Sequence, residues 1–264
     1  MLGAIFGDIA GSLFEFNNIH TKNFELINDS CRFTDDSVMT LAIEQALLDC
    51  DGNYLKLSKN AIARMREFGA KYPRRGYGKH FAQWLNDPTA VAYGSCGNGA
   101  AMRVSGIGYV AQSIKDCKFL SKAVTSVTHN HPEGIKGAEA TAVCIYLARN
   151  NYTIKQIELY VGLHYYNLAQ TVNEIRKTKF HFDAVCQETV PQAITCFLES
   201  KSYEDAIRNA ISIDGDSDTL AAITGAIAEA YYGLPENFRQ IALDKLTEEL
   251  RNVYLDFEKK FVIA

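Results

Sequence analysis

The sequence has few of the features that mark nucleic-acid-binding, membrane or secreted proteins. Its 27 Lys and Arg residues are outnumbered by 31 Asp and Glu residues, and no run of basic residues is longer than two. Non-specific binding to phosphate backbones needs a basic stripe, so the composition argues against general nucleic-acid binding. No stretch of about 18 uncharged apolar residues is present, so no membrane-spanning helix is predicted.

Targeting and redox features are also scarce. Residues 1–8 are apolar, but they lack a basic start and end in an acid, so they resemble neither a signal peptide nor a membrane anchor. The seven cysteines are scattered, odd in number and without a C-x-x-C pair. This usage favours reduced thiols, and we expect a cytoplasmic protein.

Domain linkers, repeats and strand-like alternation are nearly absent. Only five prolines occur, and none opens a Pro-, Ser- or Gly-rich linker, so residues 1–264 are predicted to form one domain. No repeat of fixed period and no low-complexity tract is found. Since no surface heptad or long apolar stripe is left over, we expect a monomer.

Helical periodicity dominates what remains. A Thr-Asp-Asp-Ser cap precedes a predicted helix over 38–48, and Pro132 opens another that runs to Arg149. Residues 221–228 are small and apolar nearly all round, which predicts a helix packed on every side. With about a dozen helices the fold is predicted to be all-α. The other predicted helices cover 56–70, 99–111, 116–127, 154–165, 183–199, 204–211, 217–232 and 236–259.

The first candidate site is Phe33-Thr34-Asp35-Asp36-Ser37 at a helix start. Two adjacent carboxylates beside a hydroxyl are hard oxygen ligands, which suit Mg²⁺, Mn²⁺ or Ca²⁺. The alternative is an ordinary helix cap, because Thr and Asp are also favoured in that position.

The second candidate site is the run from Asp214 to Thr219, directly before the apolar helix. Its three carboxylates at alternate positions repel one another unless a cation neutralises them. The residues that follow lack the remaining ligands of an EF-hand, so that motif is excluded. If the two acidic helix starts meet, they could hold two hard cations and polarise a water molecule, as in hydrolases.

Two further segments could contact a substrate. Glycines lead into a helix between Tyr93 and Arg103, and their backbone N–H groups could bind phosphate, although a simple Gly-rich turn remains open. In Thr128-His129-Asn130-His131-Pro132-Glu133 the histidines lack partners at zinc-ligand spacing. A histidine that donates to substrate oxygens fits this segment better than a zinc site does.

Together these segments resemble the ADP-ribosylglycohydrolase family. The resemblance covers nearly the whole chain, because the matching segments follow one another in the family's order. They are Gly3–Ser12 with Glu15, Phe33–Asp36, Gly97–Arg103, His129–Gly137 and Gly215–Thr219.

The resemblance implies an all-α orthogonal multi-helix bundle with two Mg²⁺ ions, which Mn²⁺ could replace. Carried over by motif position, the metal ligands are Thr34, Asp35, Asp36, Asp216, Asp218 and Thr219. The residues expected to contact the diphosphate and ribose of ADP-ribose are Gly94, Ser95, Gly97, Asn98, Gly99 and His129. Glu15 and Asp36 are expected to act catalytically, on protons and water.

The implied activity is Mg²⁺-dependent cleavage of the glycosidic bond between ADP-ribose and an acceptor, which is a modified protein side chain or a small molecule. Two alternatives stay open, a binuclear-metal nucleotide phosphohydrolase and a non-catalytic ADP-ribose-binding protein.

The sequence departs from the family's pattern at two positions. Asp214 stands where members usually carry glycine, which adds an acid beside the site. Cys96 stands where some members place an aromatic residue that stacks on adenine, so Tyr93 or another ring would have to take that role.

Overall fold

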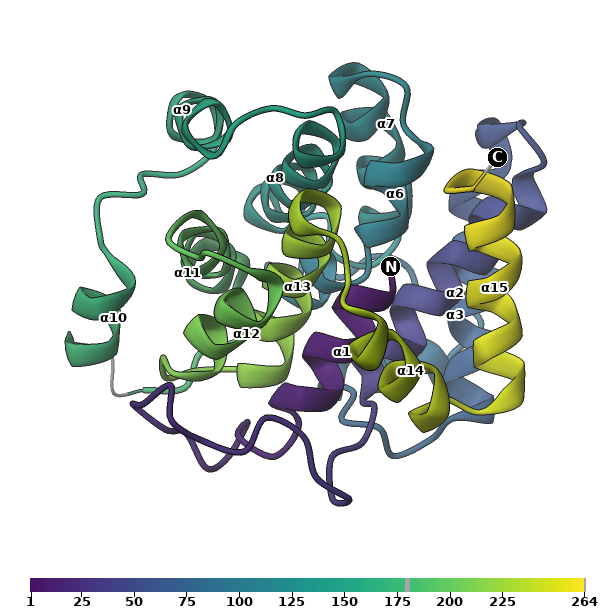
Figure 1. Ribbon diagram of the computed structural model, residues 1–264. Helices are drawn as coiled ribbons and strands as arrows, with labels where there is room; N and C mark the ends of the chain where they lie inside the picture. The colour runs from purple at the N-terminus through teal and green to yellow at the C-terminus, as the bar shows by residue number, and fades with distance from the viewer. Residues whose placement is uncertain (179–180, 264) are drawn as a thin grey trace.

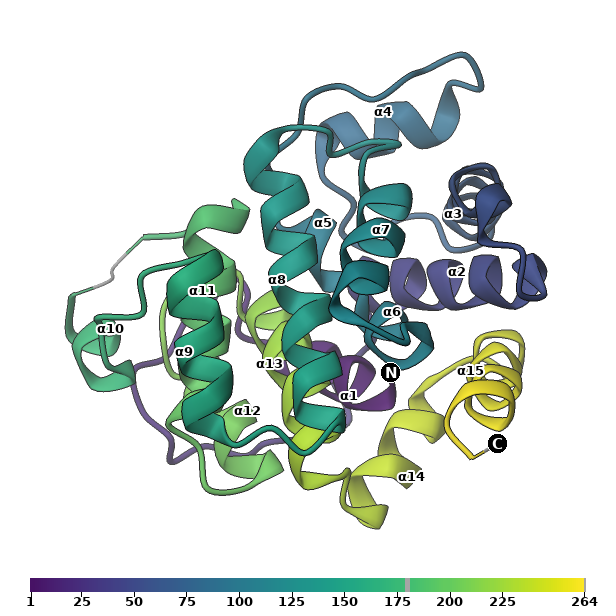
Figure 2. The same ribbon diagram turned by 90° about the horizontal axis from the view of Figure 1, so that it is seen from above.

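The structure is a computed structural model that describes residues 1–178 and 181–263 (Figures 1 and 2). These residues form α-helices, one short 3₁₀ helix and an isolated bridge between Gly97 and Val185, so the predicted all-α class is confirmed. No helix in the described part of the chain is long and apolar enough to cross a membrane.

Most of the helices follow one another along the chain with short connections, and the longest connection joins α1 to α2. Their bounds are α1 Leu2–Gly11, α2 Asp35–Cys50, η1 Tyr54–Lys56, α3 Leu57–Lys71, α4 Lys79–Asn86, α5 Gly99–Met102, α6 Ser105–Val110, α7 Ile114–Thr125, α8 Pro132–Arg149, α9 Ile154–His164, α10 Val172–Thr178, α11 Cys186–Leu198, α12 Tyr203–Ile211, α13 Ser217–Tyr232, α14 Glu236–Lys245 and α15 Glu248–Phe261.

Two of the predicted helices are wrong in extent. The one over 236–259 is divided into α14 and α15, because Leu246 is extended and the hydroxyl of Thr247 starts a new helix by accepting from the Leu250 N–H. The one over 99–111 is likewise divided into α5 and α6, with Arg103 and Val104 between them. Helices α1, α4 and α10 were not predicted.

Helix α13 lies at the centre of the fold. Its residues from Ser217 to Ala228 are all buried, as the apolar run predicted, and α1, α8, α11 and α12 pack around it (Figure 2). Helix α1 is itself buried along its whole length. A helix without a polar face has no amphipathic period, which explains why the sequence did not reveal it.

Glycines allow α1 and α13 to touch backbone to backbone. A Cβ on Gly3 would lie 2.6 Å from the carbonyl oxygen of Gly225, and one on Gly7 would lie 2.1 Å from that of Ala221. On Gly11, one would lie 2.5 Å from the Cα of Asp218. Since the three glycines are four residues apart, they form one face, and that face fixes α1 against the first turn of α13.

We expect Gly7→Ala to lower the free energy of unfolding by about 3 kcal/mol, because the added methyl group meets backbone atoms that cannot move aside alone. The matched control is Gly162→Ala in the last turn of α9, where a Cβ meets nothing within 4 Å. This control should gain about 0.5–1 kcal/mol from helix propensity. Urea denaturation measures both, and equal midpoints for the two variants would contradict the packing described.

Candidate functional site

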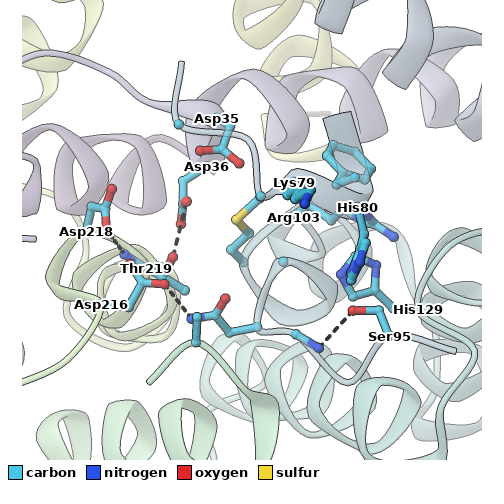
Figure 3. Close-up of a pocket in the computed structure, with 18 of the residues that line it drawn as sticks. Asp35, Asp36, Lys79, His80, Ser95, Arg103, His129, Asp216, Asp218 and Thr219 are labelled. Atoms are coloured by element: carbon cyan, nitrogen blue, oxygen red, sulfur yellow. Dashed lines mark hydrogen bonds between the residues drawn. The ribbon is translucent and has the colours of Figure 1, made fainter. Parts of the chain in front are cut away.

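A cavity of about 400 Å³ lies where the starts of α2 and α13 meet the loop after α1 (Figure 3). The loop before α5 and the segment before α8 close its other side. Thr34 and Gly94 are not among its lining residues. The lining residues that the sequence singled out are Glu15, Asp35, Asp36, Tyr93, Ser95, Gly97, Asn98, Gly99, His129, Asp216, Asp218 and Thr219.

Asp8 of α1 holds the start of α2 in place. Its buried carboxylate accepts from the backbone N–H of Thr34 at 2.9 Å, from the Thr34 hydroxyl at 2.6 Å and from the Ser37 N–H at 3.1 Å. The Ser37 hydroxyl donates to it as well. The Thr34 hydroxyl, a predicted metal ligand, is thus engaged with Asp8, and its oxygen also accepts from the Asp36 N–H. No role was predicted for Asp8, although an acid inside an apolar segment is a sign of a buried, hydrogen-bonded carboxylate.

Acids from distant parts of the chain gather at one side of the cavity. One carboxylate oxygen from each of Glu15, Asp216 and Asp218 lies within 4.8 Å of the others. Asp36 accepts from the Thr219 hydroxyl through Oδ2 at 3.2 Å, and its Oδ1 is buried without a hydrogen-bond partner. A buried carboxylate oxygen without a donor is costly, so it is available to a cation.

Burial and mutual repulsion raise the pKa values of Glu15, Asp35, Asp36 and Asp218. The pKa of Asp35 and that of Asp36 lie well above the ordinary value, mainly through burial and then through Asp8. The pKa of Asp218 is also raised well above it, by burial and by Asp216. Burial, followed by Asp216, raises the pKa of Glu15 to about 7.

The donor set therefore fits a hard divalent cation. In the part of the chain that the structure describes, no Lys or Arg forms a salt bridge with any of these acids. The carboxylates of Glu15, Asp216 and Asp218 could hold a metal ion, which would reduce the repulsion among them.

A tight loop covers the Asp35 side of the cavity. The Asp35 N–H donates to the Arg75 carbonyl at 2.8 Å, and the Arg75 guanidinium lies 3.8 Å from the centre of the Phe33 ring. Gly76 has φ +107°, and a Cβ there would lie 2.8 Å from Asp35 Oδ1. Only glycine combines that conformation with so close an approach to the carboxylate.

The glycine-rich loop reaches from Asp216 to His129 along the cavity. Asn98 donates through Nδ2 to Asp216 Oδ2 at 2.8 Å and to the Thr189 hydroxyl at 3.2 Å, which ties the loop to α13 and α11. The Gly97 N–H donates to Ser95 Oγ at 3.1 Å. Gly94 turns the chain with φ +69° and donates to an Asn130 side chain outside the cavity. The following helix, α5, spans only four residues, so a phosphate here would rely on loop N–H groups more than on a helix dipole.

The two histidines of the segment before α8 do different things. His129 is buried beside the cavity, its Nδ1 lies 2.7 Å from the Thr128 hydroxyl, and burial lowers its pKa well below the ordinary value. His131 is exposed, and its Nδ1 caps α8 by accepting from the Glu133 N–H.

Several lining residues were not singled out from the sequence. Phe16 and Phe182 are 79% and 49% exposed, and their rings stack with centroids 6.1 Å apart at the mouth beside Glu15. Arg103 is fully buried but also lines the cavity. Phe16 could have been predicted to line the cavity, because it follows Glu15 in the sequence. Phe182 could not, because it lies in a distant loop that reaches the cavity only in the folded chain.

A model of the ADP-ribosylglycohydrolase family matches residues 1–261. ADP-ribosylhydrolase ARH3 from Mus musculus is 26% identical over 96% of this chain and 90% of its own length, and that from Bos taurus is 27% identical over 96% and 92%. A solved structure, described as an ADP-ribosylglycohydrolase-related protein complex, matches the fold with a TM-score of 0.71 at 20% identity, over 98% of this chain and 96% of that one. The chain belongs to the ADP-ribosylglycohydrolase family.

Proposed function

We propose that this protein is a Mg²⁺-dependent hydrolase that cleaves the glycosidic bond between ADP-ribose and an acceptor and releases free ADP-ribose. The observation that carries the proposal is the convergence of acids from three distant segments on one cavity, which a glycine-rich loop also lines. Membership of the family and the similarity to relatives named as ADP-ribosylhydrolases support the same reaction.

The proposed metal centre has two Mg²⁺ ions, which Mn²⁺ could replace. The residues assigned to hold them are Thr34, Asp35, Asp36, Asp216, Asp218 and Thr219. When bound, the cations would supply Lewis-acid polarisation of water and of ribose hydroxyls. For the Thr34 hydroxyl to bind a cation, it has either to give up its hydrogen bond to Asp8 or to bind the cation through its oxygen while it still donates to Asp8.

The side chains of the cavity suit the charge that glycosidic cleavage creates. Positive charge develops on the ribose as the bond breaks, and the surrounding carboxylates stabilise it. Glu15, with a pKa of about 7, can take or give a proton near neutral pH, and Asp36 has a free Oδ1. Gly94, Ser95, Gly97, Asn98, Gly99 and His129 are the residues that would hold the diphosphate and ribose.

The reaction product separates this proposal from the alternatives. A nucleotide phosphohydrolase would release AMP or inorganic phosphate, and a binding protein would release nothing. For the enzyme as a whole we propose a cytoplasmic monomer acting on an ADP-ribosylated protein or small molecule.

The acceptor would meet the exposed ring pair. Phe16 is next to Glu15 in the chain, and with Phe182 it forms an apolar edge where the cavity opens to solvent. We assign this pair to contact with the acceptor, because the acids mark the end of the cavity at which the bond is cleaved.

We expect Asp218→Asn to lower the rate of ADP-ribose release about a thousandfold, because it removes one charge from the proposed metal centre and from the stabilisation of the ribose cation. The control is Asp256→Asn, an exposed acid on α15. Chromatography of the products from an ADP-ribosylated peptide, with free ADP-ribose and AMP as standards, measures both. Unchanged turnover in folded Asp218→Asn protein, or AMP as the product, would contradict the proposal.

Metal-free protein should become less stable as the pH rises from about 5 to 8. The pKa values of Asp35, Asp36, Asp218 and Glu15 are raised in the folded state, that of Glu15 to about 7, so the folded state binds protons more tightly than the unfolded chain. The contribution of these four groups to stability is therefore fully present below the ordinary carboxyl pKa values and is lost as they ionise.

Millimolar Mg²⁺ at pH 8 should raise the melting temperature by about 5 °C over that in EDTA. Glu44, whose pKa burial raises to about 7 outside the cavity, supplies a part of the pH dependence that Mg²⁺ does not change. Thermal melts of the wild type, Asp218→Asn and Asp256→Asn measure the effect. A Mg²⁺ response of equal size in Asp218→Asn would place the ion elsewhere.

Phe16→Ala should lower kcat/KM for an ADP-ribosylated peptide about tenfold, because the acceptor loses a buried ring contact. Affinity for free ADP-ribose should change less than about twofold, since that ligand has no acceptor. Phe119→Ala is the matched control, because this ring is 54% exposed on α7. Equal losses for the peptide and for free ADP-ribose would show that the ring holds ADP-ribose itself.

A further inference from the structure

Arg103 is a buried cation without an anionic partner. Its side chain is 1% exposed, and among the described residues no carboxylate lies within salt-bridge distance of it. Nη2 donates to the Val124 carbonyl at 3.2 Å and to Thr128 Oγ1 at 2.7 Å, whereas Nε has no partner. Burying an unpaired charge is costly, so an arginine at this position indicates a use for its charge.

The Thr128 hydroxyl connects Arg103 to His129 through two hydrogen bonds. The Thr128 side chain is fully buried, and its hydroxyl has two partners in the described structure, Arg103 Nη2 and His129 Nδ1, each at 2.7 Å. A guanidinium only donates, so the hydroxyl oxygen accepts from Arg103. The hydroxyl proton is then donated to His129 Nδ1. If Nδ1 instead carried the hydrogen and donated to the hydroxyl oxygen, the buried hydroxyl proton would have no acceptor.

This network determines which ring nitrogen of His129 carries the proton. With Nδ1 accepting, the neutral ring bears its hydrogen on Nε2. A Cβ on Gly97 would lie 3.5 Å from Nε2, and one on Gly99 would lie 3.4 Å from it. The N–H therefore lies beside the glycine-rich loop at the cavity (Figure 3).

We propose that Arg103 and Thr128 are positioning residues that keep His129 neutral and fixed as an Nε2–H donor to an oxygen of the bound ADP-ribose. Each donor in the series from guanidinium to hydroxyl to imidazole polarises the next, which strengthens the final N–H as a donor. The identity of the ligand rests on the proposed function, whereas the tautomer is a property of the free protein.

The first test measures the tautomer without ligand. In protein labelled with ¹⁵N-histidine, long-range ¹H–¹⁵N correlation spectra distinguish the two neutral forms, and His129→Gln assigns the signal. We expect the Nε2–H form in the wild type and in Thr128→Ser, which keeps the hydroxyl. A wild-type signal of the Nδ1–H form or of the imidazolium at pH 7 would overturn the proposal, whatever the enzyme's activity.

The second test removes the hydroxyl that links the two side chains. Thr128→Val should release the tautomer preference and weaken ADP-ribose binding, measured by calorimetry, about tenfold, while Thr128→Ser restores both. Thr125→Val is the matched control, because the Thr125 hydroxyl is also buried, one helical turn earlier, but has no hydrogen-bond partner. It should leave the tautomer and the affinity unchanged.

The outcomes distinguish the proposed hydrogen-bond relay from Arg103 through Thr128 to His129 from the proposed function. Folded Thr128→Val with wild-type tautomer and affinity would refute the relay, even if the protein hydrolyses ADP-ribosyl bonds. A fixed Nε2–H tautomer that depends on Thr128, in a protein without turnover, would support the relay and refute the hydrolase. If Thr128→Val does not fold, the wild-type and Thr128→Ser spectra still decide the tautomer.

Discussion

The backbone contact between α1 and α13 is the constraint on which the site depends. Because Gly3, Gly7 and Gly11 have no side chains, the two helices approach until backbone atoms meet, and the first turn of α13 comes to lie against the end of α1. Asp8, on the same helix, then binds the start of α2. One helix without a polar face thus positions both acidic helix starts, and a displacement of α1 would move them apart.

The cavity that results has two ends of opposite electrostatic character. Asp36, Asp216 and Asp218 lie at one end, and Arg103 with the neutral His129 lies at the other (Figure 3). A substrate with an anionic diphosphate and a ribose that becomes positive during cleavage has matching polarity. The same division keeps the buried cation from forming a salt bridge with the acids, which leaves each end free for its part of the ligand.

The sequence predicted what depends on local pattern. Helix α8 runs from Pro132 to Arg149 as predicted, because proline, an early acid and apolar spacing all act within one helix. Helix α1 could not be predicted in the same way, because burial on every side removes its period. The division of 236–259 at Leu246 was missed because good helix formers lie on both sides of the break.

The same distinction applies to the site. Asp35, Asp36, Asp216 and Asp218 stand in short runs of acids that can be read directly, and all four line the cavity. Asp8 and Arg103 are single charges inside apolar segments, and their partners are known only once the chain is folded. Roles that depend on one long-range hydrogen bond have no signal in the spacing of residues.

The glycine face also has a consequence for synthesis of the protein. The Gly3 N–H donates to Glu229, 226 residues later in the chain. At about 5–20 residues per second, a nascent α1 waits on the order of tens of seconds on the ribosome before α13 emerges. Throughout that time the glycine face of α1 lacks the helix that covers it in the folded protein, so this apolar surface stays open to chaperones that shield apolar segments.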